Sequence, residues 1–334
     1  MHGIQRAWAG WLALTLVVSA CGASGGGGSA DAADTTADTQ PPADDTADTV
    51  NPVDTGGPVD TTEPADTVAT RAEWPPPSAI GPAARPAPVL APAGYDGYAA
   101  VPAILLLGGY DYLSEDLDDW IKLSGRVDSD GFILVLPDGL IDAGGSPYWN
   151  ATDTCCDYDE SGVDDVAWLT GLIDELEARF RVSGVGLVGH SAGGFMAYRM
   201  ACEVPSRLGG LVSIAGSGYL DEALCAVTDV PLSVLQVHGE DDDVMPFFGD
   251  DEAPGAYEML DRWGARDGCD PDGWVEEYGP THYANDGDTE LGYFDGCPAG
   301  LDVRLWYLEG SDHYPDFRPA FTVDLLAWLL PHLR

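Results

Sequence analysis

Short apolar runs alternate with helical patterns along residues 85–334, and this alternation constrains the fold more than any other feature. The runs are nearly continuously apolar, which is typical of parallel strands that are covered on both faces of a sheet. Strands are expected at 103–107, 132–136, 185–188, 211–214, 232–237 and 303–308, and helices at 163–180, 192–203, 256–266 and 321–330. The order predicts an α/β fold with a doubly wound, mostly parallel sheet in a single domain.

The first 84 residues have a different composition. Residues 1–20 carry Arg6, an apolar run and then small residues, which predicts a secretory signal peptide. The following Cys21 completes a stretch, Val-Ser-Ala-Cys, that resembles the bacterial lipoprotein box, in which the cysteine is acylated. The alternative is a signal peptide that is cut nearby, with Cys21 incidental. Residues 21–84 are rich in Gly, Ala, Asp, Thr and Pro and predict a disordered tether.

The domain at 85–334 is therefore expected to be exported. It would be lipid-anchored at the bacterial cell surface or outer membrane, or extracellular, and it would meet the membrane through its anchor only. The chain has 57 acidic and 14 basic residues and a net charge of −43. Such a surface repels nucleic acid and anionic lipid, so neither is an expected partner. A monomer is expected, because the tether already attaches the domain to a surface.

Six cysteines follow the tether, and an even number in an exported domain favours disulfides. Cys269 and Cys297 flank one connecting segment, and Cys202 and Cys225 flank a return from helix to strand. We expect each of these two sets to form a pair. The adjacent cysteines at 155 and 156 would then be joined to each other or unpaired.

The stretch LVGHSAGGFM places Ser191 between Gly189 and Gly193, after an expected strand and before an expected helix. In that context the pattern predicts a nucleophile elbow, the strained turn on which α/β hydrolases carry their serine. The small neighbours permit the tight turn, and the amides that follow open a helix N-terminus that stabilises negative charge. The alternative is a glycine-rich turn without chemistry.

A serine nucleophile needs a base and an acid that orients it, in the chain order serine, acid, histidine. His313 follows an expected strand and precedes the last helix, so it is the expected base. His282 is the competing candidate, whereas His190 and His238 precede the required position. The acid should come from the run of three aspartates at 241–243, which could otherwise be a solvated loop or a weak cation site.

Several segments together resemble one known family more specifically than the elbow does. They are YWNATDTCCD, GVDDVAWLTGLIDEL, LVGHSAGGFMAYRMACEVPSRLGGLVSIAG, VHGEDDDVMPF and LWYLEGSDHYP. In order and spacing they are similar to the secreted polyhydroxybutyrate depolymerases and feruloyl esterases, over essentially the whole of 85–334. The resemblance implies an α/β-hydrolase fold and an exported serine carboxylic ester hydrolase with no cofactor and no metal.

The resemblance also selects site residues. Aligning the His-Gly and Pro of HGEDDDVMP places the catalytic acid at Asp242, with Asp243 as the fallback. The oxyanion amides are expected at Ala192 and at Tyr110, in the loop LLLGGYDY. Most relatives have His-Gly in that loop, and Gly108 stands in place of the histidine, so the loop is expected to differ in shape.

Aromatic residues near the expected site could line the acyl group. Trp149 and Tyr112 are the candidates, together with Tyr110, although Trp149 could equally be a buried packing residue. The expected substrate is a hydroxycinnamoyl ester of plant polysaccharide, and the alternative is a poly- or oligo-3-hydroxybutyrate. Outside this class, the chain could be a non-catalytic surface binding protein on a hydrolase scaffold.

Overall fold

The computed structural model describes residues 72–334 apart from 226–229, 280–281 and 286. The predicted signal peptide, the lipidation site Cys21 and most of the predicted tether lie outside the described residues. The described residues form one compact unit. Among the described helices, none has the length and the apolar content needed to span a membrane.

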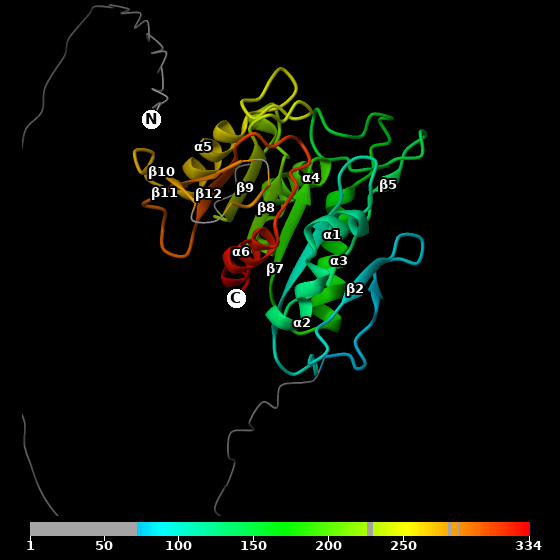
Figure 1. Ribbon diagram of the computed structural model, residues 1–334. Coiled ribbons are helices and arrows are strands. Elements are labelled where there is room, and N and C mark those ends of the chain that lie inside the picture. Colours follow the sequence, from blue (N-terminus) through cyan, green and yellow to red (C-terminus); the bar gives the residue numbers. More distant parts are fainter. Residues whose placement is uncertain (1–71, 226–229, 280–281, 286) are drawn as a thin grey trace, which may run out of the picture. The chain divides into compact units, whose positions relative to one another are not determined.

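The sheet has ten strands, with a parallel centre and antiparallel pairs at both ends (Figure 1). Its strands in spatial order are β1 (Ala79–Ile80), β2 (Ala87–Leu90), β4 (Ile133–Val135), β3 (Val101–Leu107), β7 (Val182–His190), β8 (Gly210–Ile214), β9 (Ser233–Gly239), β12 (Val303–Leu308), β11 (Thr289–Phe294) and β10 (Trp274–Tyr278). The six central strands, β4 to β12, are parallel neighbours, which confirms the mostly parallel sheet. A separate ribbon pairs β5 (Leu140–Ile141) with β6 (Pro147–Tyr148).

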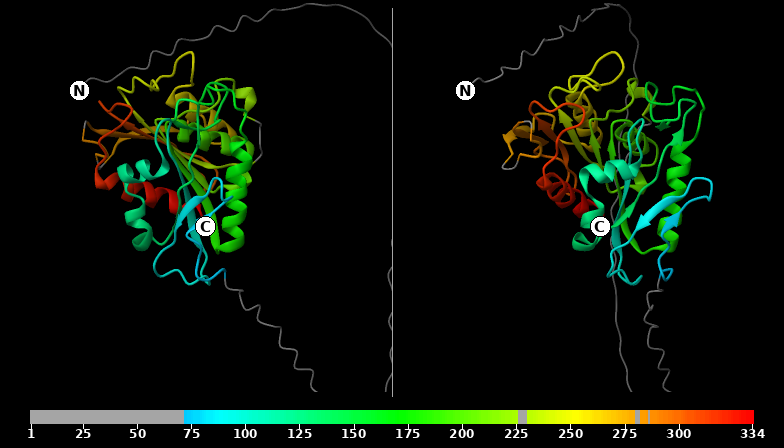
Figure 2. Two further views of the ribbon diagram at one scale, coloured as in Figure 1. Left: turned by 90° about the vertical axis from the view of Figure 1, so that its right-hand side faces the viewer. Right: turned by 45° about the vertical axis from the view of Figure 1, so that its right-hand side comes forward.

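Helices cover both faces of the sheet, as Figures 1 and 2 show. One core packs the sheet against α3 (Asp165–Arg179), α4 (Ala192–Glu203) and α5 (Ala256–Asp267). The other core packs it against α1 (Ser114–Ile121), α2 (Val127–Asp130) and α6 (Pro319–Leu329). The predicted doubly wound arrangement is confirmed.

The central strands are buried on both sides, which explains their continuous apolar runs. In β3, Leu105 and Leu107 face one core and Ile104 and Leu106 face the other, and all four side chains are fully buried. Helix signals agree with the local sequence: the side chain of Asp164 caps α3 by accepting a hydrogen bond from the amide of Ala167 at 2.8 Å.

The folded chain begins before residue 85, where the sequence placed the end of the tether. Strand β1 pairs with β2, and Ile80 is only 2 % exposed. Further out, Glu73 forms an ion pair with Arg179 at 2.6 Å. A two-residue edge strand among prolines and alanines has no periodicity to reveal it, so the sequence assigned this segment to the tether.

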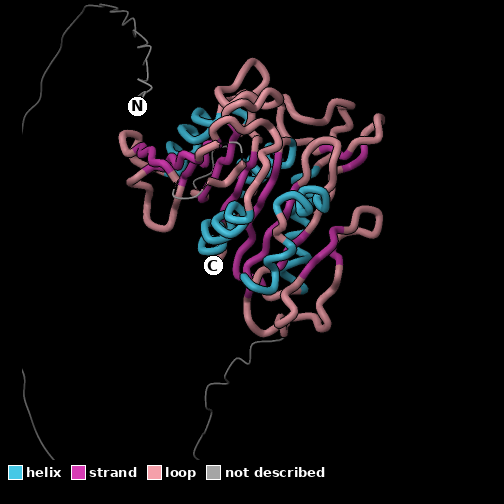
Figure 3. The backbone as a smooth tube through the Cα atoms, in the orientation of Figure 1, coloured by secondary structure: helices cyan, strands magenta, loops and turns pink. Residues whose placement is uncertain are grey.

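Parallel strands that point the same way end at one edge of the sheet. The loops after β3, β7, β9 and β12 therefore meet at that edge, which is seen at the top of Figure 3. These are the loops that carry the expected site residues.

Candidate functional site

Ser191 lies between the end of β7 and the start of α4, on a strained turn. Its backbone has φ 52° and ψ −122°, a conformation that residues other than glycine rarely adopt. The turn depends on glycine on both sides: a Cβ at Gly189 would collide with the carbonyl of Gly193, and one at Gly193 would collide with the carbonyl of Leu107. The local geometry is that of a nucleophile elbow pressed against the end of β3.

His313 and Asp242 are joined by hydrogen bonds, although they come from different loops. The Nδ1 atom of His313 lies 2.8 Å from Oδ2 and 3.0 Å from Oδ1 of Asp242. Both residues are buried, whereas Asp241 and Asp243 are exposed. With Nδ1 bound to the carboxylate, Nε2 is the ring nitrogen of His313 that remains for other chemistry.

The carboxylate of Asp242 is held in its ionised form. Burial alone would raise its pKa, but hydrogen bonds from His238, His313 and the amide of Met245 outweigh burial and hold the pKa well below its usual range. The amides of Val244 and Met245 reach Oδ1 at 3.0 and 2.7 Å. Asp242 is therefore a fixed anion beside the His313 ring.

Backbone contacts join the loops that carry the acid and the histidine. The amide of Asp241 donates to the carbonyl of Ser311 at 2.9 Å, and that of Glu240 donates to the carbonyl of Leu308 at 2.9 Å. A Cβ at Gly239 would collide with the Ser311 carbonyl. The glycine of the His-Gly pair is thus required by the close approach of the His313 loop.

His190, which directly precedes Ser191, connects the elbow to the same loop. Its Nε2 donates to the carbonyl of His313 at 2.8 Å, and its Nδ1 accepts from the hydroxyl of Tyr112. Burial, reinforced by the nearby His313, lowers the pKa of His190 to about 3, so its ring is neutral. His190 therefore ties the residue before Ser191 to the backbone of His313.

Two backbone amides near Ser191 are available to a bound ligand. Ala192 is the first residue of α4, and Tyr110 follows β3. Within the part of the chain that the structure describes, neither amide has a hydrogen-bond partner. The elbow touches the loop after β3, since a Cβ at Gly193 would collide with the carbonyls of Leu107 and Gly108.

The loop after β3 folds back over Gly108. A Cβ at this position would lie 2.7 Å from the backbone of Tyr112 and Leu113, so the following residues occupy the space that a histidine would need. The indole of Trp149 fixes the loop by donating to the Gly108 carbonyl at 2.9 Å. The backbone of Tyr112 and Leu113 thus fills the space beside Gly108.

The two aromatic candidates for an acyl pocket differ in exposure. Trp149 is 1 % exposed and packs in the core, so it is a buried packing residue. Tyr112 is half-buried, and its hydroxyl donates a hydrogen bond to Nδ1 of His190. Exposed rings stand nearby: Tyr314 packs edge-on against His313, and Tyr158 packs edge-on against Tyr110.

The competing histidine has a different carboxylate partner. His282 is exposed and pairs with Asp288 at 3.0 Å, in the connection between the edge strands β10 and β11. Among the residues with a described position, no group of three or more His, Cys, Asp or Glu has an arrangement that could hold a metal ion.

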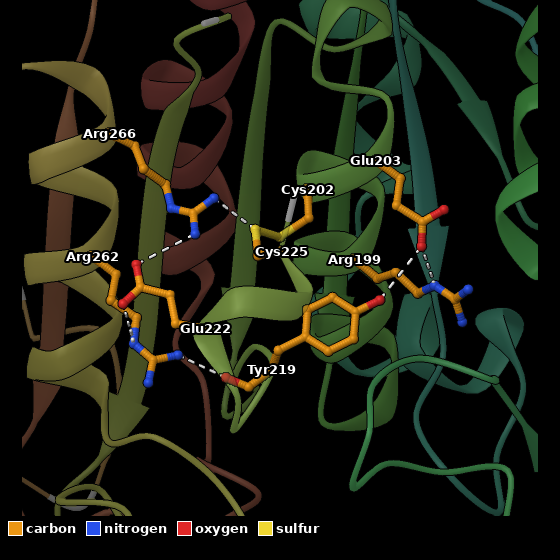
Figure 4. Close-up of a disulfide and its surroundings, with 8 residues drawn as sticks. All are labelled: Arg199, Cys202, Glu203, Tyr219, Glu222, Cys225, Arg262 and Arg266. Atoms are coloured by element: carbon orange, nitrogen blue, oxygen red, sulfur yellow. Dashed lines mark hydrogen bonds and ion pairs between the residues drawn. A yellow bond between two sulfur atoms is a disulfide. The ribbon is translucent and has the colours of Figure 1, made fainter. Parts of the chain in front are cut away.

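The structure contains both expected disulfides, Cys202–Cys225 and Cys269–Cys297, and it joins Cys155 to Cys156. Figure 4 shows the first, where α4 meets the segment before β9. Arg266 donates to the Cys225 sulfur at 2.7 Å and also pairs with Glu222. This bridge lies among ion pairs on the α4 and α5 side of the sheet.

Comparison with known proteins gives one family and several relatives. Residues 146–261, which include the elbow and Asp242, match the family described as phospholipase/carboxylesterase. A protein of Nocardia uniformis subsp. tsuyamanensis assigned as an esterase (NocK) is 30% identical over 155 residues, which are 46% of this chain and 43% of the relative. The chain thus spans less than half the length of that relative.

A protein of Aspergillus niger assigned as feruloyl esterase C is 27% identical over 209 residues, 57% of this chain and 67% of the relative. Among solved structures, an acetyl xylan esterase from Aspergillus awamori superposes with a TM-score of 0.52 at 15% identity, covering 75% of this chain and 95% of the other. At that identity the likeness shows the fold alone.

Proposed function

We propose that this chain, which has the α/β-hydrolase fold and matches the phospholipase/carboxylesterase family over residues 146–261, is a serine carboxylic ester hydrolase. The observation that carries the proposal is the buried hydrogen bond between His313 and Asp242 at the edge of the sheet that holds the Ser191 elbow. A strained serine, a histidine and an ionised carboxylate in this chain order are the parts of a catalytic triad.

In the proposed mechanism, Nε2 of His313 takes the hydroxyl proton of Ser191 as the oxygen attacks the ester carbonyl. Asp242 holds the ring by Nδ1 and stabilises the imidazolium that forms. The amides of Tyr110 and Ala192 receive the oxyanion, and each such donor is typically worth about 3 kcal/mol in the transition state. His313 then protonates the leaving alcohol, and water releases the acyl group from Ser191 by the reverse steps.

The substrate we propose is a feruloyl-type ester of plant polysaccharide. The relative assigned as feruloyl esterase C supports this class. Three exposed aromatic rings on loops at this edge of the sheet could stack on a flat aromatic acid: Tyr158 (68 %), Phe248 (79 %) and Tyr314 (57 %). Of these, Tyr314 packs against His313 itself. An oligo-3-hydroxybutyrate is the second candidate, because the exposed apolar side chains of Val244 and Phe248 on the loop after Asp242 would also suit an aliphatic polyester.

A cavity beside the loop after β3 suits the sugar part of such a substrate. It has a volume of about 340 Å³ and is lined by hydroxyl, amide and carboxyl groups together with an aromatic ring; the lining residues are Asn150, Thr152, Asp153, Thr154, Cys155, Asp157, Tyr158, Glu160 and Gly162. Tyr158 joins the cavity to the proposed oxyanion loop, because its ring centre lies 5.6 Å from that of Tyr110. Acidic lining with an aromatic platform favours a neutral, hydroxyl-rich ligand over an anion.

We further propose that the protein is an exported monomer, lipid-anchored through Cys21. The sequence of residues 1–21 supports export and acylation. The three disulfides are consistent with an oxidising compartment. Labelling of cells with a radioactive fatty acid, followed by comparison with Cys21→Ala, tests the anchor.

The substrate is tested by assaying the chain and its Ser191→Ala variant side by side on methyl ferulate and on a 3-hydroxybutyrate trimer. The proposal predicts cleavage of the ferulate, by the unaltered chain only. Faster cleavage of the trimer would support the proposed ester hydrolase activity but would show that the proposed feruloyl substrate is wrong. Binding without cleavage of either ester would support a binding protein on a hydrolase scaffold instead.

A further inference from the structure

A chain of buried polar side chains runs through the protein and ends at Asp242. The Tyr198 hydroxyl on α4 donates to Oε1 of Gln236 at 2.8 Å. Nε2 of Gln236 then donates to Nδ1 of His238 at 3.0 Å and to the Gly216 carbonyl at 2.8 Å. Tyr198 and Gln236 are fully buried and His238 is 3 % exposed, so water does not share these hydrogen bonds.

The pattern of donors fixes the proton on His238. The Gln236 amide has two hydrogens, and one of them is directed at Nδ1, which must therefore be the unprotonated nitrogen of the ring. The proton resides on Nε2, which donates to the carbonyl of Met245 at 2.7 Å and lies 3.3 Å from Oδ2 of Asp242. His238 is thus a neutral donor that faces the proposed catalytic acid.

We propose that His238 is a positioning residue, which sets the orientation and charge of Asp242 and, through it, the basicity of His313. His238 acts on the acid in two ways: Nε2 lies 3.3 Å from Oδ2, an electrostatic contact, and its hydrogen bond to the Met245 carbonyl fixes a residue that itself binds Asp242. Both backbone groups of Met245 are held, since its carbonyl accepts from His238 and its own amide donates to Oδ1 of Asp242 at 2.7 Å. The inference rests on the proposed function, because it assigns a role within the proposed triad.

Packing alone would be a different explanation for His238. A packing role needs a side chain of the right volume, whereas a positioning role needs a donor at the place of Nε2. Leucine keeps most of the volume and has no donor. Glutamine carries an amide N–H at a similar distance from the backbone, so His238→Gln retains the donor that His238→Leu removes.

The pH dependence of catalysis separates these roles. The titratable groups that face Asp242 are His238 on β9, His313 and Tyr314 on the loop after β12, and His190 at the end of β7. Without the His238 donor, the negative charge of Asp242 acts on His313 alone and holds an added proton there more tightly. The ascending limb of the profile of kcat/KM against pH should therefore move to higher pH.

The experiment compares the unaltered chain with Ser191→Ala, His238→Leu, His238→Gln and His332→Leu on 4-nitrophenyl acetate. His332 is the matched control, because it is a partly buried histidine that bonds Ser233 at 3.1 Å, away from Asp242. For His238→Leu we expect a loss of about 10- to 100-fold in kcat with little change in KM, and an upward shift of about half a pH unit in the ascending limb. His238→Gln should recover most of both effects, and His332→Leu should leave both unchanged.

Two results would overturn the inference: an unshifted pH profile in His238→Leu, or no recovery in His238→Gln although both variants stay folded by their thermal unfolding. If the unaltered chain is no faster than Ser191→Ala, the proposed function fails by itself. The role of His238 is then still decided by proton NMR, where the resonance of the His313 Nδ1–H bound to Asp242 should keep its chemical shift in His238→Gln and move in His238→Leu.

Discussion

The Nδ1 atom of His313 lies 2.8 Å from Oδ2 of Asp242, although the two residues are 71 positions apart in the sequence. They meet because β9 and β12 are parallel neighbours, with His238 beside Tyr307 and Gly239 beside Leu308 in register. The acid and the histidine leave two adjacent strands at the same edge of the sheet. The pairing of these strands therefore places the acid beside the histidine.

Replacing the acid should damage catalysis without damaging binding. In Asp242→Asn the amide cannot hold the His313 tautomer or stabilise its imidazolium, so kcat should fall by on the order of 10³–10⁴ with KM within a few-fold. Steady-state kinetics on an activated ester measures both constants. Asp243→Asn is the matched control, because this neighbour is exposed, and it should stay within about 2-fold of the unaltered chain. Equal losses in both variants would contradict the assignment of Asp242.

The loop after β3 should be sensitive to a single methyl group. In Gly108→Ala the new Cβ would lie 2.7 Å from backbone atoms of Tyr112 and Leu113, so the loop that carries the Tyr110 amide must shift. We expect kcat to fall by about 10²-fold, the typical cost of losing one oxyanion donor. At Gly125 no atom lies within 4 Å of the added Cβ, so Gly125→Ala should have ordinary kinetics. A fully active Gly108→Ala would argue against this loop as part of the oxyanion site.

Asp267 should make stability depend on pH. Burial raises its pKa to about 7 from an ordinary value of 3.8. Between these two values the folded chain keeps a proton that the unfolded chain releases, so the free energy of unfolding falls as pH rises through this window. Its Oδ1 accepts from the Leu232 amide at 3.0 Å, and its Oδ2 has no partner among the described residues.

Asp267→Asn keeps the acceptor and removes the buried charge. We expect it to stabilise the protein by about 2 kcal/mol at pH 8, a rise of about 5 °C in Tm, and to have little effect near pH 4. Thermal unfolding at the two pH values measures this difference. The same change in Tm at both pH values would show that the carboxyl of Asp267 does not titrate in this range.

Residues before 85 should contribute to stability. A chain that starts at 85 loses β1, the buried Ile80 and the hydrogen bond from the Gly81 amide to Glu175 at 2.7 Å. Relative to a chain that starts at 72, we expect a loss of about 3 kcal/mol, most of it from Ile80. Glu73→Gln alone should cost less than about 1 kcal/mol, because its ion pair with Arg179 is partly exposed. Equal unfolding midpoints for the two starting points would assign residues 72–84 to the tether.

The sequence predicted the centre of the fold well, because the relevant strands and helices are long and buried. The six central strands and helices α3 to α6 lie within a few residues of their predicted positions. The edges were missed: β1 has two residues, and β10 is half-exposed and charged, so neither has a continuous apolar run. Antiparallel edge strands lack the signal that revealed the parallel centre.

The site shows a similar division. Ser191, Asp242 and His313 could be found because each follows a strand end in a recognisable motif. The supporting residues could not, since a hydrogen bond such as that from Gln236 to His238 depends on which face of β9 meets α4 and on the tautomer. Burial is also hard to predict for a single aromatic residue: Trp149 was a candidate for substrate contact, but it is buried in the core.

The central claim is that Ser191 is a nucleophile activated by His313. Its most direct test is the rate of labelling by a fluorophosphonate, read by intact mass and by the modified peptide, in the unaltered chain, Ser191→Ala and His313→Ala. We predict one adduct per chain, on the peptide that contains Ser191, with no adduct in Ser191→Ala and labelling at least about 10³-fold slower in His313→Ala. An unlabelled chain, or an adduct that persists in Ser191→Ala, would contradict the account.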